Sequence, residues 1–224
     1  MNIGRWAVQK AKQALLPQQR AFRRVVFGPA AGCSIMLDLN HELRLYLGIY
    51  ERELWSSYKA LLTRGMNSFD IGGRDGYSAL LIAKHTAAQV LSFECEPTGL
   101  ALMQATFERN ELPVRAIQAF VGSRANPLTT MTVDEAAQNF FRPDFIKIDV
   151  EGGEADVLMG ASALLADNPP KMIVEVHGSA AERDCLEHLE RFAYDVKIVD
   201  RSTLFPEKRP LEHNRWLVCV PVRT

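Results

Sequence analysis

The sequence predicts an α/β fold: a mostly parallel sheet with helices on both faces and an antiparallel hairpin at its C-terminal edge. From residue 66, short apolar runs alternate regularly with stretches that have helical spacing or good helix formers. Such alternation is typical of βαβ units, whose parallel strands are covered on both faces. Two strand-like runs near the C-terminus, 194–200 and 215–221, have no helix between them, which favours an antiparallel pair.

The alternating part of the chain supplies the sheet and most of its helices. Prolines mark several boundaries, because proline lacks a backbone donor and restricts the residue before it. Thr132 and Glu135 match a capping box at the start of one helix. The expected strands are 66–71, 89–94, 114–120, 144–149 and 172–177, and the expected helices are 76–86, 98–110, 132–141, 153–166 and 180–193.

The N-terminal part does not follow this alternation. We expect residues 1–62 to form an N-terminal helix and cap segment, and residues 63–224 to form the sheet domain. In the cap, 25–39 predicts a hairpin, and 51–64 predicts a helix that leads into the sheet. Residues 1–24 are basic and have a partial apolar stripe, so weak peripheral contact with an anionic membrane is one interpretation. A solvated helix packed on the domain is the interpretation we favour.

Composition and charge argue against several classes of protein. With 224 residues, of which 47% are hydrophobic, the chain can bury a core without metal or disulfide support. Its formal net charge of −1 argues against nucleic acid as the main partner, because phosphate binding needs a basic surface. The four cysteines form no CxxC pair, which indicates neither a zinc cluster nor a disulfide framework and fits a cytoplasmic location. No apolar run approaches the roughly 18–20 residues of a membrane span.

A glycine-rich loop follows the first strand of the series, in the stretch FDIGGRDGY. In an open parallel sheet, ligands bind beyond the carboxyl ends of the strands, so this loop predicts a ligand site. Gly72, Gly73 and Gly76 let the backbone turn tightly and let a ligand approach closely. Asp70, just before the loop, would repel the diphosphate that a dinucleotide site holds at the helix N-terminus. The loop therefore favours S-adenosylmethionine, which carries an ammonium and a sulfonium, over NAD.

An acidic residue ends the second strand, where a carboxylate can accept hydrogen bonds from ribose hydroxyls. The stretch reads SFECEP. We prefer Glu94, which directly follows the apolar run, over Glu96, which shares its face two residues later. The predicted cofactor-binding residues are thus Asp70, Gly72, Gly73, Gly76 and Glu94.

Charged residues also mark the ends of the fourth and fifth strands. In DFIKIDVEGGE, Lys147, Asp149 and Glu151 alternate with apolar residues and so share one strand face. A buried central strand tolerates such groups only where they are paired or face a site. In IVEVHG, Glu175 and His177 share a face, with His177 at the strand tip. A salt-bridged cluster that only fixes the following loop is the alternative interpretation.

Taken together, these stretches resemble the FkbM-type methyltransferases of the class I S-adenosylmethionine-dependent superfamily. The matching segments come in the family's order and cover roughly residues 48–180: GIYERE, FDIGGRDGY, SFECEP, IKIDVEGGEADVLMGA and IVEVH. The resemblance implies a Rossmann-like fold with a seven-stranded sheet. It also implies methyl transfer, usually to the oxygen of a small molecule such as a sugar, a polyketide or another metabolite.

The resemblance further implies a role for individual positions, with one departure from the family pattern. Gly73 and Arg74 stand where the family loop usually has alanine and asparagine. Arg74 adds a cation that either points to solvent or holds the donor's carboxylate. The family's donor site falls on Asp70, Gly72, Gly76 and Glu94, its adenine-flanking region on Ala119 and Phe120, and its fourth- and fifth-strand signatures on Asp149, Glu151 and His177.

Methyl transfer requires the acceptor oxygen, methyl and sulfur to be aligned, and the hydroxyl proton to be removed. We expect His177 to act as the base, because an imidazole pKa of about 6.5 suits this step, with Asp149 positioning it or the substrate. Asp149 and Glu151 could instead hold Mg²⁺, but two carboxylates are a thin basis, and we predict no metal site. Two rival functions fit the same fold: an NAD-linked oxidoreductase, disfavoured by Asp70, and a non-catalytic module that has kept the fold.

Overall fold

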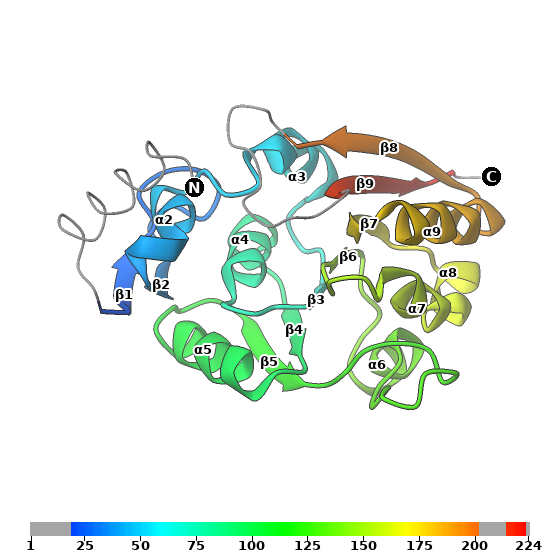
Figure 1. The fold of residues 1–224 in the computed structure, drawn as a ribbon, viewed down its shortest axis with the longest axis horizontal. Helices are drawn as coiled ribbons and strands as arrows, with labels where there is room; N and C mark the ends of the chain where they lie inside the picture. The colour runs from blue at the N-terminus through cyan, green and yellow to red at the C-terminus, as the bar shows by residue number, and fades with distance from the viewer. Residues whose placement is uncertain (1–18, 202–213, 223–224) are drawn as a thin grey trace, which may run out of the picture.

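The computed structural model describes residues 19–201 and 214–222 (Figure 1). Seven strands form one sheet in the order β5-β4-β3-β6-β7-β9-β8. Neighbouring strands from β5 to β7 run parallel, and β9 pairs antiparallel with both β7 and β8. The predicted mostly parallel sheet with an antiparallel edge hairpin is therefore confirmed. The strands are β3 Ser68–Ile71, β4 Val90–Glu94, β5 Val114–Gln118, β6 Phe145–Ile148, β7 Lys171–His177, β8 Tyr194–Asp200 and β9 Asn214–Pro221.

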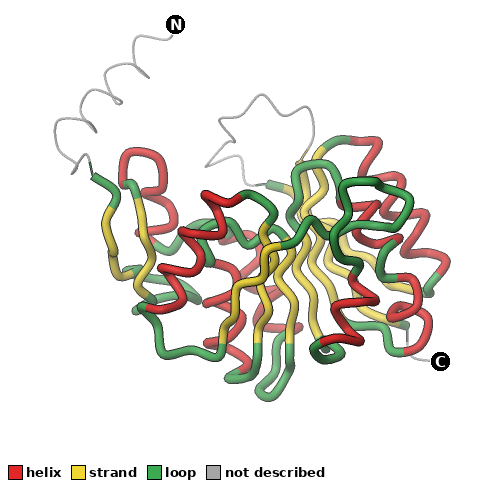
Figure 2. The backbone as a smooth tube through the Cα atoms, turned by 90° about the horizontal axis from the view of Figure 1, so that it is seen from below, coloured by secondary structure: helices red, strands yellow, loops and turns green. Residues whose placement is uncertain are grey.

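Helices lie on both sides of the sheet, as Figure 2 shows when the strands are viewed from below. The third of the expected helices begins with the predicted capping box, in which Thr132 accepts from Glu135 N and Glu135 accepts from Thr132 N. The helices that connect the strands are α4 Tyr77–Thr86, α5 Pro97–Glu108, α6 Val133–Asn139, α7 Glu154–Met159, α8 Ser162–Asp167 and α9 Ser179–Arg191.

The sheet separates two apolar cores, because alternate residues of a strand point to opposite faces. On β7, Ile173 packs into one core and Val174 into the other. The first core also contains Leu37 and Leu54 of the cap segment, packed with Leu80 of α4. The cap is thus continuous with the core of the sheet domain, and a division after residue 62 remains a prediction.

The hairpin expected at 25–39 forms, but its first strand lies earlier than expected. β1 (Ala21–Arg24) pairs antiparallel with β2 (Ser34–Leu37), so the first strand ends just before the predicted hairpin begins. Val26 instead donates its N–H to the carbonyl of Tyr46, at the end of a helix that was not expected, α2 (Leu39–Leu47). The β-branched pair at 25–26 looks like a strand in sequence. Val25 does pair within the hairpin, where its N–H donates to the carbonyl of Cys33 at 2.9 Å, and only Val26 bonds to a different element.

Two expected helices are shorter than predicted. The helix expected at 51–64 is a 3₁₀ turn, η1 (Arg52–Leu54), followed by α3 (Trp55–Leu61). The helix expected at 153–166 is broken into α7 and α8 at Gly160. A Cβ on Gly160 would lie 2.2 Å from the carbonyl oxygen of Gly122, so the break permits a close backbone contact.

Some expectations fall on parts of the chain that the structure does not describe. The basic helix was expected over residues 1–24, but residues 21–24 form the strand β1 instead. The rest of that expected helix falls mainly within residues 1–18, and the expected connection between the last two strands falls within 202–213. Both are outside the described residues. None of the helices in the described part is both long and apolar enough to cross a membrane.

Candidate active site

A cavity of about 870 Å³ opens at the carboxyl ends of the central strands. This volume lies within the range of pockets that bind small molecules and cofactors. The strand order reverses at β3, which has β4 on one side and β6 on the other, so the cavity lies at the switch point of the sheet. It is lined by the glycine loop, the end of β4, the segment after β5, the end of β6 and parts of the cap.

The glycine loop is fixed by close contacts within the protein. Gly72 has φ +89°, and a Cβ there would lie 1.8 Å from the carbonyl oxygen of Asp149. Gly76 has φ +84°, and its Cβ would lie 2.7 Å from the ring of Phe107. A Cβ on Gly73 would meet the hydroxyl of Ser92, although Gly72 and Gly73 also line the cavity. The backbone therefore requires these predicted glycines, whether or not a ligand approaches them.

Asp70 is buried beneath this loop and does not reach the cavity wall. Its Oδ2 accepts a hydrogen bond of 2.7 Å from the hydroxyl of Ser92. Burial raises the pKa of Asp70 to about 6, and the ammonium of Lys147 opposes that rise. At neutral pH the carboxylate carries a negative charge directly behind the loop.

Glu94 lies at the cavity wall, at the end of β4. Its two oxygens accept backbone hydrogen bonds, Oε2 from Arg74 N at 2.9 Å and Oε1 from Glu96 N at 2.8 Å. These bonds fix a buried carboxylate beside the glycine loop, where each oxygen keeps a lone pair for another donor. Glu96 also lines the cavity but is exposed, and Arg74 is exposed at its rim.

Asp75 is a buried carboxylate at the cavity that the sequence reasoning missed. Its Oδ1 accepts from Tyr77 N at 3.0 Å, and burial raises its pKa. In sequence, an aspartate two residues before a helix looks like an ordinary cap, and only the fold shows that it faces the cavity.

A buried ammonium links the end of β6 to the cap. Lys147 Nζ lies 3.1 Å from Asp149 Oδ2 and 3.4 Å from Glu51 Oε1. The side chain of Lys147 is only 2% exposed, so its charge needs a partner in the interior, and Asp149 is the closer carboxylate. Burial raises the pKa of Glu51 to about 8, despite Lys147, so Glu51 is largely neutral at pH 7. Glu51 was missed as a site residue, although it belongs to the GIYERE stretch.

Glu175 lies beside Lys147 and Asp149, and its carboxylate accepts several hydrogen bonds. Its oxygens accept from the guanidinium of Arg201, from Asn214 Nδ2 at 3.0 Å and from Trp216 Nε1 at 2.9 Å. Burial alone would raise its pKa, but hydrogen bonds and the cations Lys147 and Arg201 hold the pKa below its usual range. Glu175 is therefore ionised and structurally engaged.

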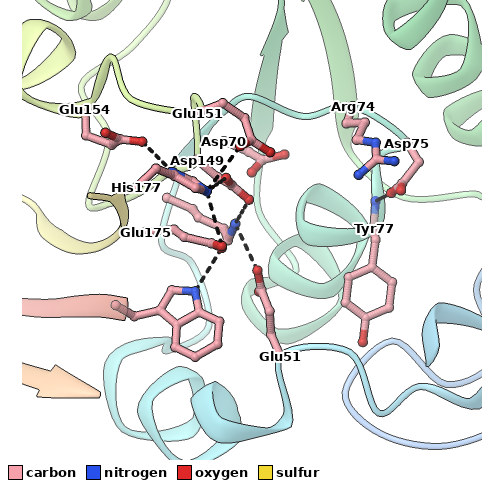
Figure 3. Close-up of polar contacts among 12 residues, drawn as sticks. Glu51, Asp70, Arg74, Asp75, Tyr77, Asp149, Glu151, Glu154, Glu175 and His177 are labelled. Atoms are coloured by element: carbon pink, nitrogen blue, oxygen red, sulfur yellow. Dashed lines mark hydrogen bonds and ion pairs between the residues drawn. The ribbon is translucent and has the colours of Figure 1, made fainter. Parts of the chain in front are cut away.

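His177, at the tip of β7, is enclosed by carboxylates (Figure 3). Its Nδ1 lies 2.7 Å from Glu154 Oε1, and its Nε2 lies 3.7 Å from Asp149 Oδ1 and 3.6 Å from Glu151 Oε2. Burial lowers the pKa of His177, but the hydrogen bond to Glu154 and the other carboxylates raise it to about 10. A protonated ring cannot accept a proton at neutral pH, so the geometry does not support the expected role of His177 as the base.

More than half of the sequence matches a known family. A model described as the methyltransferase FkbM domain matches residues 66–207. The chain belongs to the FkbM methyltransferase family. Among curated proteins, none matches this sequence.

Solved structures similar to this FkbM protein share its fold. The FkbM methyltransferase from Methylobacillus flagellatus KT is 18% identical with a TM-score of 0.58, and the match covers 81% of this chain and 53% of that one. This chain therefore spans about half the length of that relative. Precorrin 8w decarboxylase from Methanobacterium thermoautotrophicum is 17% identical with a TM-score of 0.57, covering 78% of this chain and 91% of that one. Fibrillarin from Aeropyrum pernix, bound to S-adenosyl-L-methionine, is 14% identical with a TM-score of 0.52, covering 70% and 67%.

The family and the Rossmann-like methyltransferase fold support methylation that depends on S-adenosylmethionine. The cavity of this FkbM domain fits that cofactor, because a fixed carboxylate, Glu94, stands beside a loop without side-chain bulk at Gly72 and Gly73. Ala119 and Phe120 line the same cavity, on the segment after β5. The structure thus brings the predicted donor residues to one place, except that the carboxylate of Asp70 lies behind the loop.

Proposed function

We propose that this protein transfers the methyl group of S-adenosylmethionine to a hydroxyl oxygen of a small metabolite, such as a sugar or a polyketide. One observation carries the proposal. A single cavity is lined both by the glycine loop with Glu94 and by Asp149 with Glu151. A donor and an acceptor can therefore occupy one enclosed space, which is what an in-line transfer requires.

The donor side is suited to a nucleoside with a cationic tail. Glu94 would accept hydrogen bonds from the ribose hydroxyls, and Ala119 and Phe120 would flank the adenine. The negative charge of Asp70, behind the loop, favours an ammonium group in front of it. When bound, S-adenosylmethionine supplies a methyl group on a positively charged sulfur, which is already an activated leaving group.

The acceptor side is suited to a hydroxyl group. Asp149 lines the cavity, and burial raises its pKa, although Lys147 opposes that rise. Its carboxylate can accept a hydrogen bond from the acceptor hydroxyl and take up the proton as the new bond to carbon forms. His177 contacts Asp149 from behind and is a positioning residue in this scheme. These roles reverse those that we expected from the sequence.

The charge of the cavity argues against the rival functions. Carboxylates outnumber arginines along its wall, so a diphosphate or a nucleic acid backbone would be repelled. This disfavours an NAD-linked oxidoreductase and an RNA acceptor. A non-catalytic module of the same fold would bind the donor but show no transfer to any acceptor.

The first experiment compares ligands by calorimetry. S-adenosylhomocysteine should bind with measurable affinity, whereas NAD should not; tighter binding of NAD would reject the proposal.

The second experiment follows isotope-labelled methyl transfer to pools of hydroxylated metabolites. Asp149→Asn should lower kcat by more than about a hundredfold, since a positioned base contributes roughly 10²–10⁴-fold, and should change the affinity for S-adenosylhomocysteine less than twofold. Full turnover by this variant would exclude Asp149 as the proton acceptor.

A further inference from the structure

We propose that Asp149, Glu151 and His177 form a binding site for a divalent first-row transition-metal cation at the acceptor end of the cavity. These three residues each offer one ligand atom, and the atoms lie within 4.8 Å of one another. The proposal does not depend on methyl transfer, because cation binding is measurable without a donor or an acceptor. It also departs from the sequence expectation, which counted only two carboxylates.

The buried Nε2 atom of His177 is the evidence that this acidic cluster is a metal-binding site. The side chain of His177 is 5% exposed, and its Nε2 is buried without a hydrogen-bond partner among the described residues. That nitrogen faces Asp149 Oδ1 at 3.7 Å and Glu151 Oε2 at 3.6 Å, both too long for hydrogen bonds. Glu175 Oε1 lies 3.5 Å from the same nitrogen, but that oxygen already accepts from two other side chains. A buried nitrogen with no partner is costly unless something else satisfies it.

The other ring nitrogen, Nδ1, is hydrogen-bonded to a buried carboxylate, as is common for histidines that bind metals. Glu154 Oε1 lies 2.7 Å from Nδ1 and also accepts from Gly152 N at 2.8 Å. The Glu154 side chain is fully buried, so the acceptor is fixed. A bound ion would displace the proton from Nε2 and leave the other proton on Nδ1, so that the lone pair of Nε2 would point between the two carboxylates. A carboxylate behind a ligating histidine orients the ring and raises its basicity.

The spacing suits one ion. Zinc–nitrogen and zinc–oxygen bonds are about 2.0–2.2 Å long, so two ligand atoms of one ion lie roughly 3–4 Å apart. The separations of Nε2 from Asp149 Oδ1 and Glu151 Oε2, 3.7 and 3.6 Å, fall in that range. Asp149 and Glu151 also line the cavity, so an ion between them would keep open positions for water or an acceptor oxygen.

A second acidic cluster nearby does not have these properties. Glu51, Asp149 and Glu175 also bring oxygens together, but the ammonium of Lys147 lies 3.4 Å from Glu51 and 3.1 Å from Asp149. Glu175 itself accepts from Arg201, Asn214 and Trp216. The oxygens of Glu51 lack hydrogen-bond partners among the described residues, but the ammonium of Lys147 already supplies a cation to this cluster. The side of Asp149 that faces His177 is left for an external cation.

The ligand set indicates which ions bind. One imidazole and two carboxylates suit Mn²⁺ and Zn²⁺, whereas Mg²⁺ prefers oxygen ligands alone. A bound cation would lower the pKa of a hydroxyl that reached it, so Asp149 would then orient the acceptor as a ligand of the ion. We expect Mn²⁺ and Zn²⁺ to bind more tightly than Mg²⁺.

The test is a titration of chelator-treated, desalted full-length protein with MnCl₂, in which the electron paramagnetic resonance signal of free Mn²⁺ is followed. The wild type should bind one equivalent saturably. His177→Asn keeps an amide donor near the position of Nδ1 for Glu154 and removes the ligating nitrogen, so affinity should fall more than about tenfold. His41→Asn, which changes a histidine that is 77% exposed on the cavity rim, should change affinity less than twofold.

A second pair of variants decides the outcome if His177→Asn does not fold. Glu151→Gln alters a side chain that is 58% exposed and should weaken Mn²⁺ binding more than about tenfold. Glu96→Gln removes the same charge from an exposed cavity residue outside the cluster and should leave binding within twofold. Absence of saturable Mn²⁺ and Zn²⁺ binding by the wild type, or equal losses in Glu151→Gln and Glu96→Gln, would overturn the site and leave His177 as an internal cation.

Discussion

Glu154 holds His177 by one ring nitrogen, at 2.7 Å, and leaves the other nitrogen facing Asp149 and Glu151. This pairing changes the chemical role that we assign to His177, which ends the fifth parallel strand. A free imidazole at that position would be a proton acceptor. An imidazole fixed by a buried carboxylate is instead a cation when protonated, or a ligand when neutral.

Glu154→Gln tests whether this pairing matters beyond stability. The amide oxygen can still accept from Gly152, but it no longer raises the basicity of the ring. We expect the affinity for Mn²⁺ to fall about tenfold or more, which is typical of the loss of a partner behind a metal ligand. The measurement is the same Mn²⁺ titration, with the unfolding midpoint recorded in parallel. Unchanged affinity in a folded variant would show that Glu154 only packs.

Glu94→Gln should weaken the binding of S-adenosylhomocysteine by about 10- to 100-fold. A hydrogen bond to a charged group contributes about 1.5–3 kcal/mol, and each 1.4 kcal/mol is about a tenfold change in affinity. Glu96→Gln is the control, because Glu96 lines the same cavity but is exposed. Calorimetric titration of both variants with S-adenosylhomocysteine shows which of Glu94 and Glu96 contacts the ribose. A larger loss in Glu96→Gln would transfer the ribose contact to that residue.

Asp70 should make the stability of the protein depend on pH. Burial raises its pKa to about 6 from an ordinary value of 3.8, so between these values the folded state holds the proton more tightly than the unfolded state. The stabilising contribution is complete below about pH 4 and is lost as the pH rises to about 6. Relative to Asp70→Asn, the wild type should lose up to about 3 kcal/mol across this window. Urea unfolding at pH 4, 5 and 6 measures the difference, and a constant difference would contradict the assignment.

Lys147→Met should destabilise the fold by about 3–5 kcal/mol, because it leaves Asp149 in the interior without its cation. Arg142→Met offers a matched control, since Arg142 pairs with Asp167 at the surface, where the side chains are 60% and 64% exposed. That variant should lose less than about 1 kcal/mol. Urea unfolding of both proteins provides the comparison. Equal losses would mean that Lys147 is not the compensating charge.

Gly72→Ala should be far more damaging than Gly65→Ala. Both glycines have positive φ, +89° and +90°, so both substitutions strain the backbone by about 1–2 kcal/mol. Only at Gly72 would the new Cβ also strike the carbonyl oxygen of Asp149, at 1.8 Å, which adds about 1–3 kcal/mol. Thermal unfolding should separate the two variants clearly. Similar midpoints would indicate that the loop moves away from β6 at little cost.

The sheet was predictable because its signal is local and repeated. The runs at 66–71 and 144–149 are short, largely apolar and bounded by breakers, and both form central strands. The first strand of the N-terminal hairpin lies earlier than predicted. Val26 has a strand-like side chain, but its N–H bonds to Tyr46, far along the chain, and not to the hairpin.

The site residues also divide into some that were predictable from the sequence and others that were not. Glu94 and Asp149 stand at strand ends, where the fold class alone directs attention, and both line the cavity. Glu51 and Asp75 were missed because each looks in sequence like an ordinary turn or helix-capping residue. Only the folded structure shows that the N-terminal cap segment and the glycine loop bring them to the same cavity. The protonation of His177 was not predictable, because it depends on Glu154, which lies 23 residues away on a different element.

The amide of Asp149 donates to the carbonyl of Ile71 at 2.9 Å, and the next residue, Gly72, rests on Asp149's own carbonyl. The glycine loop and the end of β6 are therefore held together by main-chain contacts rather than by adjustable side chains, and under the proposed function these two segments face the donor and the acceptor. Residues of the cap such as Glu42 and Leu45 border the same cavity from a separate element. Substitutions confined to these lining side chains can therefore reshape the acceptor pocket, whereas Leu54 and Glu51 of the same segment have to be kept for the core and for Lys147.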